Sequence, residues 1–347
     1  MFKKKTGIIV FILLLLVVLV ACKEKDTAES APKETEEPKE TEPVEEEPKF
    51  VYPFTGIKTN EQVNNRAVAV MVNNYYKARP QTGLSKADIV FEILAEGNIT
   101  RFIAFFQSQQ PEVVGPVRSA REYYFNLAKD YNALYIYHGA ATHVEAELQA
   151  TGPDNLSGSI YDNDGYLFKR ADFREAPHNS YLQFENVYEE AAEQGYEVEV
   201  EYEPLPFLTE EEIPNIQGNT ATDISFSYFS NDPIHYKYDT ASEKYLRYNG
   251  DMQTVEYETD EAIQLDNLFI LETAHAVIDD AGRREIDLQS GGNALLIQKG
   301  KVQEVQWQNV DGRILPYKDG QPVGLVPGQT WVNVIPERIG LNSITIQ

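Results

Sequence analysis

Residues 87–106 read ADIVFEILAEGNITRFIAFF, which is two apolar runs joined at the polar tripeptide Glu96-Gly97-Asn98. Apolar runs of this length that meet at a glycine-containing turn are typical of a β-hairpin. Two further runs, RAVAVMV (66–72) and ALYIYHG (133–139), predict buried strands. Together these segments predict that a sheet forms the core of the first half of the chain.

Helical patterns alternate with these strands. Val117–Tyr131 has the spacing of a helix, and the Gly-Pro pair directly before it would mark its start. Thr142 and Glu145 have the spacing of a capping box, which would open a short second helix. A third helix is expected over residues 180–194. The first half is therefore predicted to be of mixed α/β type.

The residue pattern changes in the second half, where nearly all of the sequence after Ala221 predicts strands and tight turns. The chain from residue 50 onward is longer than a single core usually supports. We expect an α+β protein with an N-terminal α/β domain over residues 50–203 and a mostly antiparallel β domain over residues 204–347. Alternatively, the second region completes the sheet of the first domain.

The N-terminus has the anatomy of a bacterial lipoprotein signal. It opens with MFKKK, runs apolar from Gly7 to Ala21 and meets the single cysteine of the chain at Cys22. The apolar run is shorter than the roughly 20 residues that span a bilayer, and residues 19–22 (LVAC) match the lipobox. We expect cleavage of residues 1–21 and a lipid thioether, with palmitate among its acyl chains, on Cys22; the alternative is an uncleaved signal anchor.

Residues 22–49 are expected to follow the lipid as a disordered acidic linker, because EEPKETEPVEEEPK has almost nothing to bury. The whole chain has 30 Lys and Arg against 55 Asp and Glu, a formal net charge of −25. This charge repels nucleic-acid backbones and anionic lipid headgroups, which excludes nucleic acid as a partner. It suits basic protein surfaces, cations or neutral glycans, and a role in solubility alone explains it equally well.

Two arginines form the strongest candidate for a binding site in the sequence. Arg118 and Arg121 would lie in the first turn of the predicted 117–131 helix and on the same face of it. Cations at the start of a helix are unfavourable because they oppose the helix dipole, so two arginines there suggest a functional role. Together with the unpaired N–H groups of the first turn, they would form an anion site for carboxylate or phosphate. The structural alternative is that Glu92, Glu96 or Glu122 neutralises them.

Two more arginines lie in turn-like segments. Arg79 belongs to the loop RPQTGL, and Arg101 follows the tip of the hairpin predicted for residues 87–106. If these loops face the start of the 117–131 helix, Arg79 and Arg101 would complete one cleft that binds an anionic ligand or partner.

Histidines are the candidates for acid–base chemistry. His138 ends a predicted strand, and His178 lies in the loop APHNSY; a structural role for each is the alternative. His143 and Glu147 share a helix face at a spacing that could hold a metal, but the sequence supplies no third ligand, so no metal site is predicted. No catalytic residue is assigned beyond His138 and His178 as weak candidates.

Several catalytic and cofactor motifs are absent from the sequence. There is no G-x-S-x-G elbow, no H-E-x-x-H, no G-x-x-x-x-G-K and no G-x-G-x-x-G after a strand. No cofactor is implied, and a binding protein is favoured over an enzyme.

The order of motifs resembles the YerB-like family of bacterial lipoproteins. The segments that carry the resemblance are RAVAVMVNN, ARPQTGLSKADIVFEILAEGNITRFIAFF, VGPVRSAREYYF, YHGAATH, APHNSY, NALLIQKGKVQEVQW and VGLVPGQTWVNVIP. YHGAATH and the region Met252–Glu258 depart from the family pattern. The resemblance implies a domain of unknown function, an α/β N-terminal part, a smaller C-terminal part and anchoring at the surface of Gram-positive cells. It carries no established catalytic residue.

The sequence therefore predicts a lipid-anchored protein on the extracytoplasmic face of the cell membrane. We expect a non-catalytic binding or adaptor protein of the cell envelope, with a protein of cell-wall synthesis or a wall polymer as partner. The alternative is an envelope hydrolase or transferase that acts on an anionic wall substrate with His138 or His178 as acid–base.

Overall fold

The computed structural model describes residues 48–229 and 232–347. The predicted signal peptide (1–21), Cys22 and nearly all of the predicted linker (22–49) lie outside these residues. Within the described part, no helix has the length and apolarity that crossing a membrane requires.

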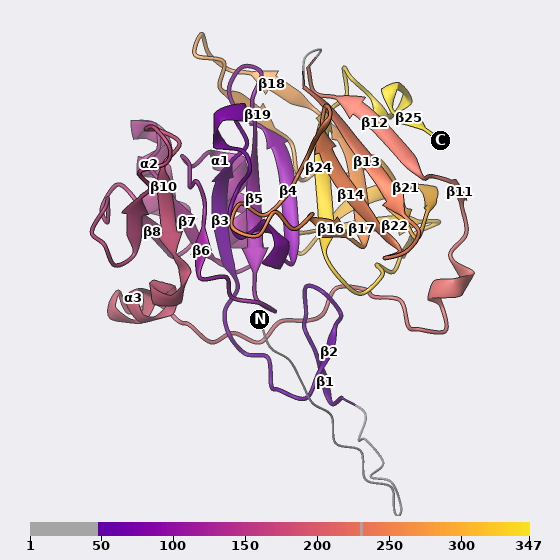
Figure 1. The fold of residues 1–347 in the computed structure, drawn as a ribbon, viewed down its shortest axis with the longest axis horizontal. Coiled ribbons are helices and arrows are strands. Elements are labelled where there is room, and N and C mark those ends of the chain that lie inside the picture. Colours follow the sequence, from indigo (N-terminus) through magenta and orange to yellow (C-terminus); the bar gives the residue numbers. More distant parts are fainter. Residues whose placement is uncertain (1–47, 230–231) are drawn as a thin grey trace, which may run out of the picture. The chain divides into compact units, whose positions relative to one another are not determined.

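One large sheet forms the core of the described residues (Figure 1). Its 12 strands follow the order β23-β22-β21-β20-β17-β24-β4-β5-β3-β7-β8, with β11 paired to β21. The first half supplies β3 (Val68–Asn73), β4 (Ile89–Leu94), β5 (Thr100–Phe106), β7 (Leu134–Tyr137) and β8 (Asn155–Ser157). The second half supplies β11 (Asn219–Thr220), β17 (Asn267–Thr273), β20 (Gly292–Gln298), β21 (Lys301–Val310), β22 (Arg313–Lys318), β23 (Gln321–Pro322) and β24 (Thr330–Pro336).

The hairpin predicted over residues 87–106 is confirmed. β4 and β5 pair antiparallel, with Ile89 opposite Phe105 and Leu94 opposite Thr100. Every residue of both strands is buried, because β4 lies between β24 and β5 while β5 lies between β4 and β3. Strands in the interior of a sheet that is covered on both faces need apolar residues at nearly every position.

Both halves of the chain contribute to this sheet. β24, from the second half, pairs in parallel with β4 of the first half and with β17 of the second. The described residues form one compact unit. The protein is mostly β, and the second region does complete the sheet of the first, which was the alternative left open by the sequence.

A second sheet packs against the large one. It contains β12 (Asp223–Ser227), β13 (Pro233–Asp239), β14 (Lys244–Asn249), β15 (Met252–Gln253), β16 (Gln264–Leu265) and β25 (Thr345–Ile346). Burial alternates along β12 and β14, as expected for a sheet with one face in the core. The sheets are joined by the ion pair between Arg247 of β14 and Glu92 of β4, and by the Tyr236 hydroxyl, which donates to Asn333 Oδ1 at 2.6 Å.

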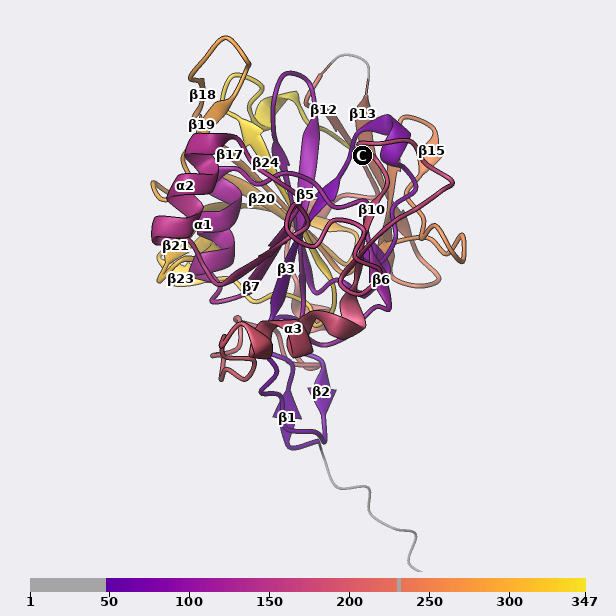
Figure 2. The ribbon, with the colours of Figure 1, turned by 90° about the vertical axis from the view of Figure 1, so that its left-hand side faces the viewer.

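Three α-helices lie within the described residues: α1 (Glu122–Asp130), α2 (Thr142–Thr151) and α3 (Val187–Glu193). α1 and α2 lie side by side (Figure 2). The predicted capping box does not form at α2, because Ala141 is its N-cap residue and no side chain caps it. Glu145 instead accepts a hydrogen bond from the Tyr137 hydroxyl at 2.7 Å.

The predicted starts of α1 and α3 are wrong. α1 begins at Glu122 and not at Val117, because residues 117–120 are extended and bonded to neighbouring strands. Ser180–Gln183, predicted to open the third helix, forms strand β10. These tertiary hydrogen bonds satisfy backbone groups that the local helical pattern would otherwise pair within a helix.

Short elements complete the fold. The strands are β1 (Phe50–Val51), β2 (Lys58–Thr59), β6 (Val113–Val114), β9 (Phe168–Arg170), β10 (Ser180–Gln183), β18 (His275–Val277) and β19 (Arg284–Ile286). Single 3-10 turns lie at Tyr76–Ala78, Leu84–Lys86, Phe184–Asn186, Ile213–Asn215 and Leu341–Ser343.

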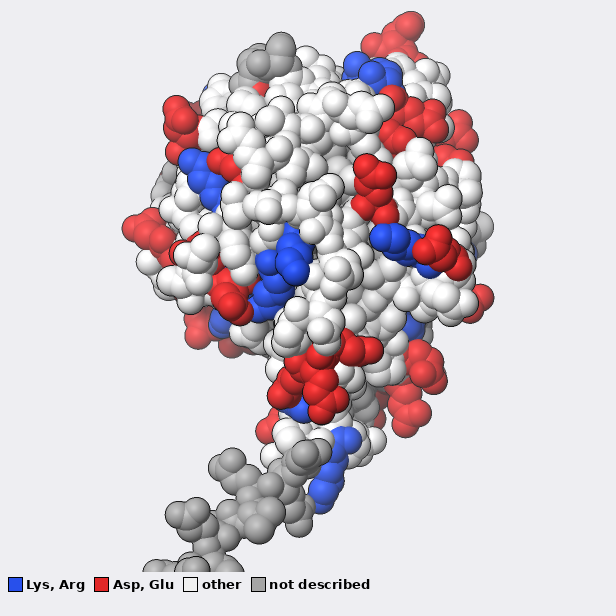
Figure 3. Space-filling view, turned by 90° about the vertical axis from the view of Figure 1, so that its right-hand side faces the viewer, with Lys and Arg blue, Asp and Glu red and all other residues white. Residues whose placement is uncertain are grey.

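The acidic composition is visible on the surface. On the face shown in Figure 3, Asp and Glu side chains gather in several groups, Lys and Arg are fewer, and uncharged residues cover most of the area. This distribution leaves no broad basic surface on that face for a polyanion to bind.

Candidate functional site

The direction of the strands defines one end of the large sheet as the place for a site. β3, β7 and β8 are parallel to one another, and so are β17, β24 and β4. β5 is antiparallel to both β3 and β4, so β3 and β4 run in the same direction. The two groups of three strands are therefore parallel to each other. Sheets of this kind commonly bind ligands beyond the carboxyl ends of their strands. We refer to this end as the carboxyl edge.

Residues 117–120 cross the carboxyl edge as an extended strap. The Arg118 N–H donates to the Met71 carbonyl of β3 at 2.9 Å, and the Arg118 carbonyl accepts from the His138 N–H at 2.9 Å. The Val117 N–H donates to the Ser180 carbonyl of β10 at 2.7 Å. Three strands or strand ends therefore fix the backbone position of Arg118, which lies before α1 and not within its first turn.

Arg118 is the candidate arginine without a carboxylate partner. Its side chain is half-buried and makes no ion pair within residues 48–229 and 232–347. Burial and the nearby charge of Arg101 lower the pKa of Arg118 to about 10, which still leaves it charged at neutral pH. A half-buried guanidinium with its donors free is a ready receptor for carboxylate or phosphate.

The other three candidate arginines each contact a carboxylate, and two of them share one. Arg101 and Arg121 both contact Glu96, the former at 3.0 Å. Arg79 makes a bidentate pair with Asp232, at 3.1 and 2.6 Å. The pairing of Arg121 with Glu96 is the structural alternative that the sequence left open for Arg118 and Arg121. The partners of Arg79 and Arg101 were not predicted.

Both candidate histidines lie within the electrostatic reach of Arg118. His138 Nδ1 is 2.7 Å from Ser180 Oγ, and His178 Nδ1 is 2.8 Å from Asn73 Nδ2. Burial, followed by the charge of Arg118, lowers the pKa of His178. Burial and the charges of Arg170 and Arg118 lower the pKa of His138. Both imidazoles are therefore neutral at neutral pH. We call these five residues, Asn73, Arg118, His138, His178 and Ser180, the Arg118 site.

Hydrogen-bond partners assign the tautomers of the two rings. An amide nitrogen can only donate, so His178 Nδ1 accepts from Asn73 and its Nε2–H remains available to a ligand. Arg170 Nη2 lies 3.5 Å from His138 Nε2 and can only donate, so His138 Nδ1 carries the proton and donates it to Ser180 Oγ. In this arrangement His138 cannot remove a proton from the buried Ser180 hydroxyl. The geometry therefore favours binding over nucleophilic catalysis.

From residues 48–229 and 232–347 the structure adds no third ligand to His143 and Glu147, the pair whose spacing could hold a metal. His143 Nε2 lies 3.9 Å from Glu122 Oε1. Among the described residues, no group of three or more His, Cys, Asp or Glu is arranged to hold a metal ion.

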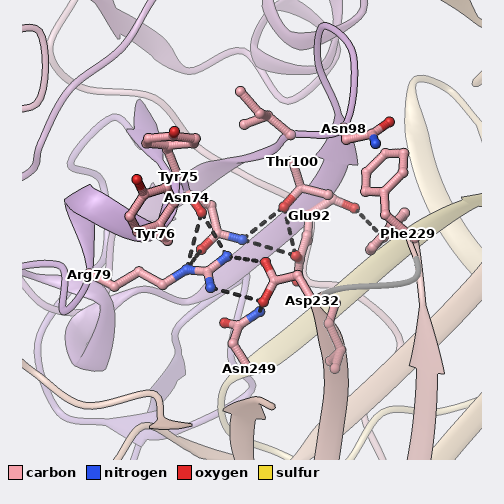
Figure 4. A pocket seen from close by; sticks show the side chains of 13 residues that line it. Asn74, Tyr75, Tyr76, Arg79, Glu92, Asn98, Thr100, Phe229, Asp232 and Asn249 are labelled. Atoms are coloured by element: carbon pink, nitrogen blue, oxygen red, sulfur yellow. Dashed lines mark hydrogen bonds and ion pairs between the residues drawn. The ribbon is translucent and has the colours of Figure 1, made fainter.

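Sequence reasoning missed a second feature, a pocket of 390 Å³ between the two sheets (Figure 4). It borders on Glu92, whose carboxylate accepts from five side chains: those of Asn74, Thr100, Arg247, Trp331 and Asn333. The available signal was a glutamate in the middle of a continuous apolar strand. Its partners come from distant parts of the chain and no spacing reveals them.

Comparison with known proteins places the chain in a family. Residues 54–197 match the N-terminal domain model, and residues 224–332 the C-terminal domain model, of the protein of unknown function DUF3048. A Bacillus subtilis (strain 168) protein named "Putative lipoprotein YerB" is 43% identical over 324 residues, which is 92% of each chain. The crystal structure of the Bacillus subtilis YerB protein matches with a TM-score of 0.79 and 44% identity, covering 86% of this chain and 100% of that one. This chain belongs to the DUF3048 family of YerB-like proteins.

Proposed function

We propose that this protein is a lipid-anchored, extracytoplasmic binding protein of the cell envelope that recognises a carboxylate or phosphate group through Arg118. The observation that carries the proposal is the half-buried Arg118 guanidinium, which has no carboxylate partner in the described part of the chain. It lies at the carboxyl edge of the sheet, on a strap fixed by hydrogen bonds to β3, to His138 directly after β7, and to β10. The neighbouring His178 Nε2–H supplies a second donor for the same anion.

The anchor in this proposal is a lipid on Cys22. It rests on the LVAC motif and the short apolar segment before it, and the name of the Bacillus subtilis relative is consistent with it. A domain on such an anchor would meet wall polymers and the proteins that assemble them. We therefore expect the anion to belong to a wall polymer or to a protein of cell-wall synthesis.

An envelope hydrolase or transferase is the weaker proposal. It would need His138 or His178 as acid–base, and each ring has its Nδ1 hydrogen-bonded to a buried side chain, that of Ser180 or Asn73. His178 Nδ1 accepts from Asn73, and His138 Nε2 faces the Arg170 guanidinium at 3.5 Å, so neither ring has an unpartnered basic nitrogen to take a proton from a substrate.

The Arg118 site predicts a specific loss of anion binding. In the full chain in detergent micelles, Arg118→Ala should weaken binding of inorganic phosphate or of a glycerol-phosphate wall fragment at least 10-fold, as measured by isothermal titration calorimetry. Loss of one charge-assisted contact with a partly desolvated anion costs about 1.5–3 kcal/mol, which agrees with this factor. Arg118→Lys should retain part of the affinity because it keeps the charge and loses the fork.

The matched control is Arg313→Ala, on β22 at the opposite side of the strand order from β7 and β8. It should bind as the wild type does. Equal affinities for the wild type and Arg118→Ala, with both proteins folded by circular dichroism, would remove Arg118 from the site and with it the proposal.

A further inference from the structure

The pocket between the two sheets is a second site, distinct from the Arg118 site, and we propose that it binds a neutral saccharide ring. Its volume of 390 Å³ lies within the roughly 300–1,000 Å³ of small-molecule sites. Both halves of the chain build its walls, with Tyr75, Tyr76 and Asn98 from the first half and Phe229 and Asp232 from the second. We call it the Tyr76 pocket.

The charged side chains that line the Tyr76 pocket are paired with oppositely charged side chains of the protein. Arg79 is held by Asp232 in a bidentate ion pair, and the Arg79 Nε also donates to Asn74 Oδ1 at 3.0 Å. Glu92 is paired with Arg247 at 2.9 Å. An ionised ligand would therefore meet no net opposite charge in the pocket and would lose its hydration without compensation. This selects a neutral ligand.

The lining is too polar for a purely apolar ligand. The Asn98 amide makes no side-chain hydrogen bond to any described residue, and the Asp232 side chain is 46% exposed, so its oxygens can accept further hydrogen bonds. An apolar group would bury these atoms unsatisfied, at a cost of about 1–3 kcal/mol each. Hydroxyl groups satisfy both, since a hydroxyl can donate to Asp232 and can donate to or accept from Asn98.

Aromatic rings supply the other part of sugar recognition. Tyr76 is 58% exposed, and its ring lies 4.4 Å from that of Tyr75. In Figure 4 these two rings lie on one side of the pocket, with Asn98 and Phe229 across from them. The C–H face of a pyranose packs on such rings while its hydroxyls reach the polar groups.

Cleavage of the sugar does not follow from this geometry. Both oxygens of the Glu92 carboxylate are occupied by the donors named above, and the Asp232 carboxylate is engaged by Arg79. Glycoside hydrolysis needs one carboxyl group free to deliver a proton and a second free to activate water or attack. The Tyr76 pocket is therefore a binding site.

The test uses the full chain in a detergent without a sugar headgroup. Glucose, N-acetylglucosamine and the β-1,4-linked disaccharide of N-acetylglucosamine are probed by saturation-transfer NMR and titration, with glucuronic acid as the charged counterpart. At least one neutral sugar should bind, more tightly than glucuronic acid. Tyr76→Ala and Asn98→Ala should each weaken that binding at least 10-fold; both side chains are accessible enough for the variants to fold.

Two controls separate this site from others. Tyr166→Ala removes a tyrosine that is 38% exposed and lies outside the pocket, and it should leave sugar binding unchanged. Arg118→Ala should also leave it unchanged, so failure of the anion proposal and failure of this one are distinguishable. The proposal is overturned if no neutral sugar binds, if a blocked dipeptide such as N-acetyl-leucinamide binds in its place, or if binding survives both pocket substitutions.

Discussion

Arg247→Met is expected to lower the free energy of unfolding by about 3–5 kcal/mol, because it leaves the Glu92 carboxylate buried without its counter-charge. The side chains of Arg247 and Glu92 are 0% and 1% exposed, and their N–O distance is 2.9 Å. The guanidinium also stacks over the rings of Phe102 and Trp331, at 5.5 and 5.2 Å from their centroids. Urea unfolding of the wild type and the variant, followed by circular dichroism, measures the difference.

An exposed ion pair provides the matched control. Lys299 pairs with Glu243, whose side chain is 63% exposed, and Lys299→Met should cost no more than about 1 kcal/mol. The double variant Glu92→Gln, Arg247→Met should recover part of the stability lost in Arg247→Met, since it removes the unpaired charge and keeps an oxygen that accepts from the remaining donors. If Arg247→Met is as stable as Lys299→Met, then the Glu92–Arg247 pair contributes no more to the free energy of unfolding than a surface ion pair does.

Asp88→Asn is expected to change how stability depends on pH. Burial raises the pKa of Asp88 from 3.8 to about 6, and hydrogen bonds from the Ser108 hydroxyl and from the backbone N–H groups of Ser108 and Gln107 oppose the rise only in part. Between pH 4 and 6 the folded protein therefore holds a proton that the unfolded chain has released. The contribution of Asp88 to stability falls as pH rises through this window, by about 3 kcal/mol in all, and is level above it.

The measurement is the difference in unfolding free energy between the wild type and Asp88→Asn at several pH values from 4 to 8. Titrations common to both proteins cancel in this difference. Relative to the variant, the wild type should lose stability as pH rises from 4 to 6 and then remain constant. Asp172→Asn, at an exposed position, is the surface control and should change the free energy of unfolding by no more than about 0.5 kcal/mol at neutral pH. A difference for Asp88→Asn that is flat with pH would contradict the burial argument.

Local sequence patterns predicted the central hairpin because the hairpin is stabilised by pairing of adjacent segments and by burial of apolar side chains, and both can be read from a short stretch of sequence. β4 and β5 are neighbours in the chain, and their continuous apolarity records burial on both faces. The start of α1 could not be predicted in the same way. Residues 117–120 have helical spacing, yet hydrogen bonds from β3 and β10, far away in the sequence, hold them extended. A local pattern contains no information about such partners.

The sequence by itself determined the central strands of the first half (β3, β4, β5 and β7), the β character of the second, the family and the residue types able to bind an anion. The tertiary structure decided which of those residues are free to do so. Glu96 reaches both Arg101 and Arg121, and Asp232 reaches Arg79, while the strap over the carboxyl edge holds Arg118 beside two histidines. The physical reason is that the charge of a side chain is a local property, whereas its pairing and burial depend on segments that only folding brings together.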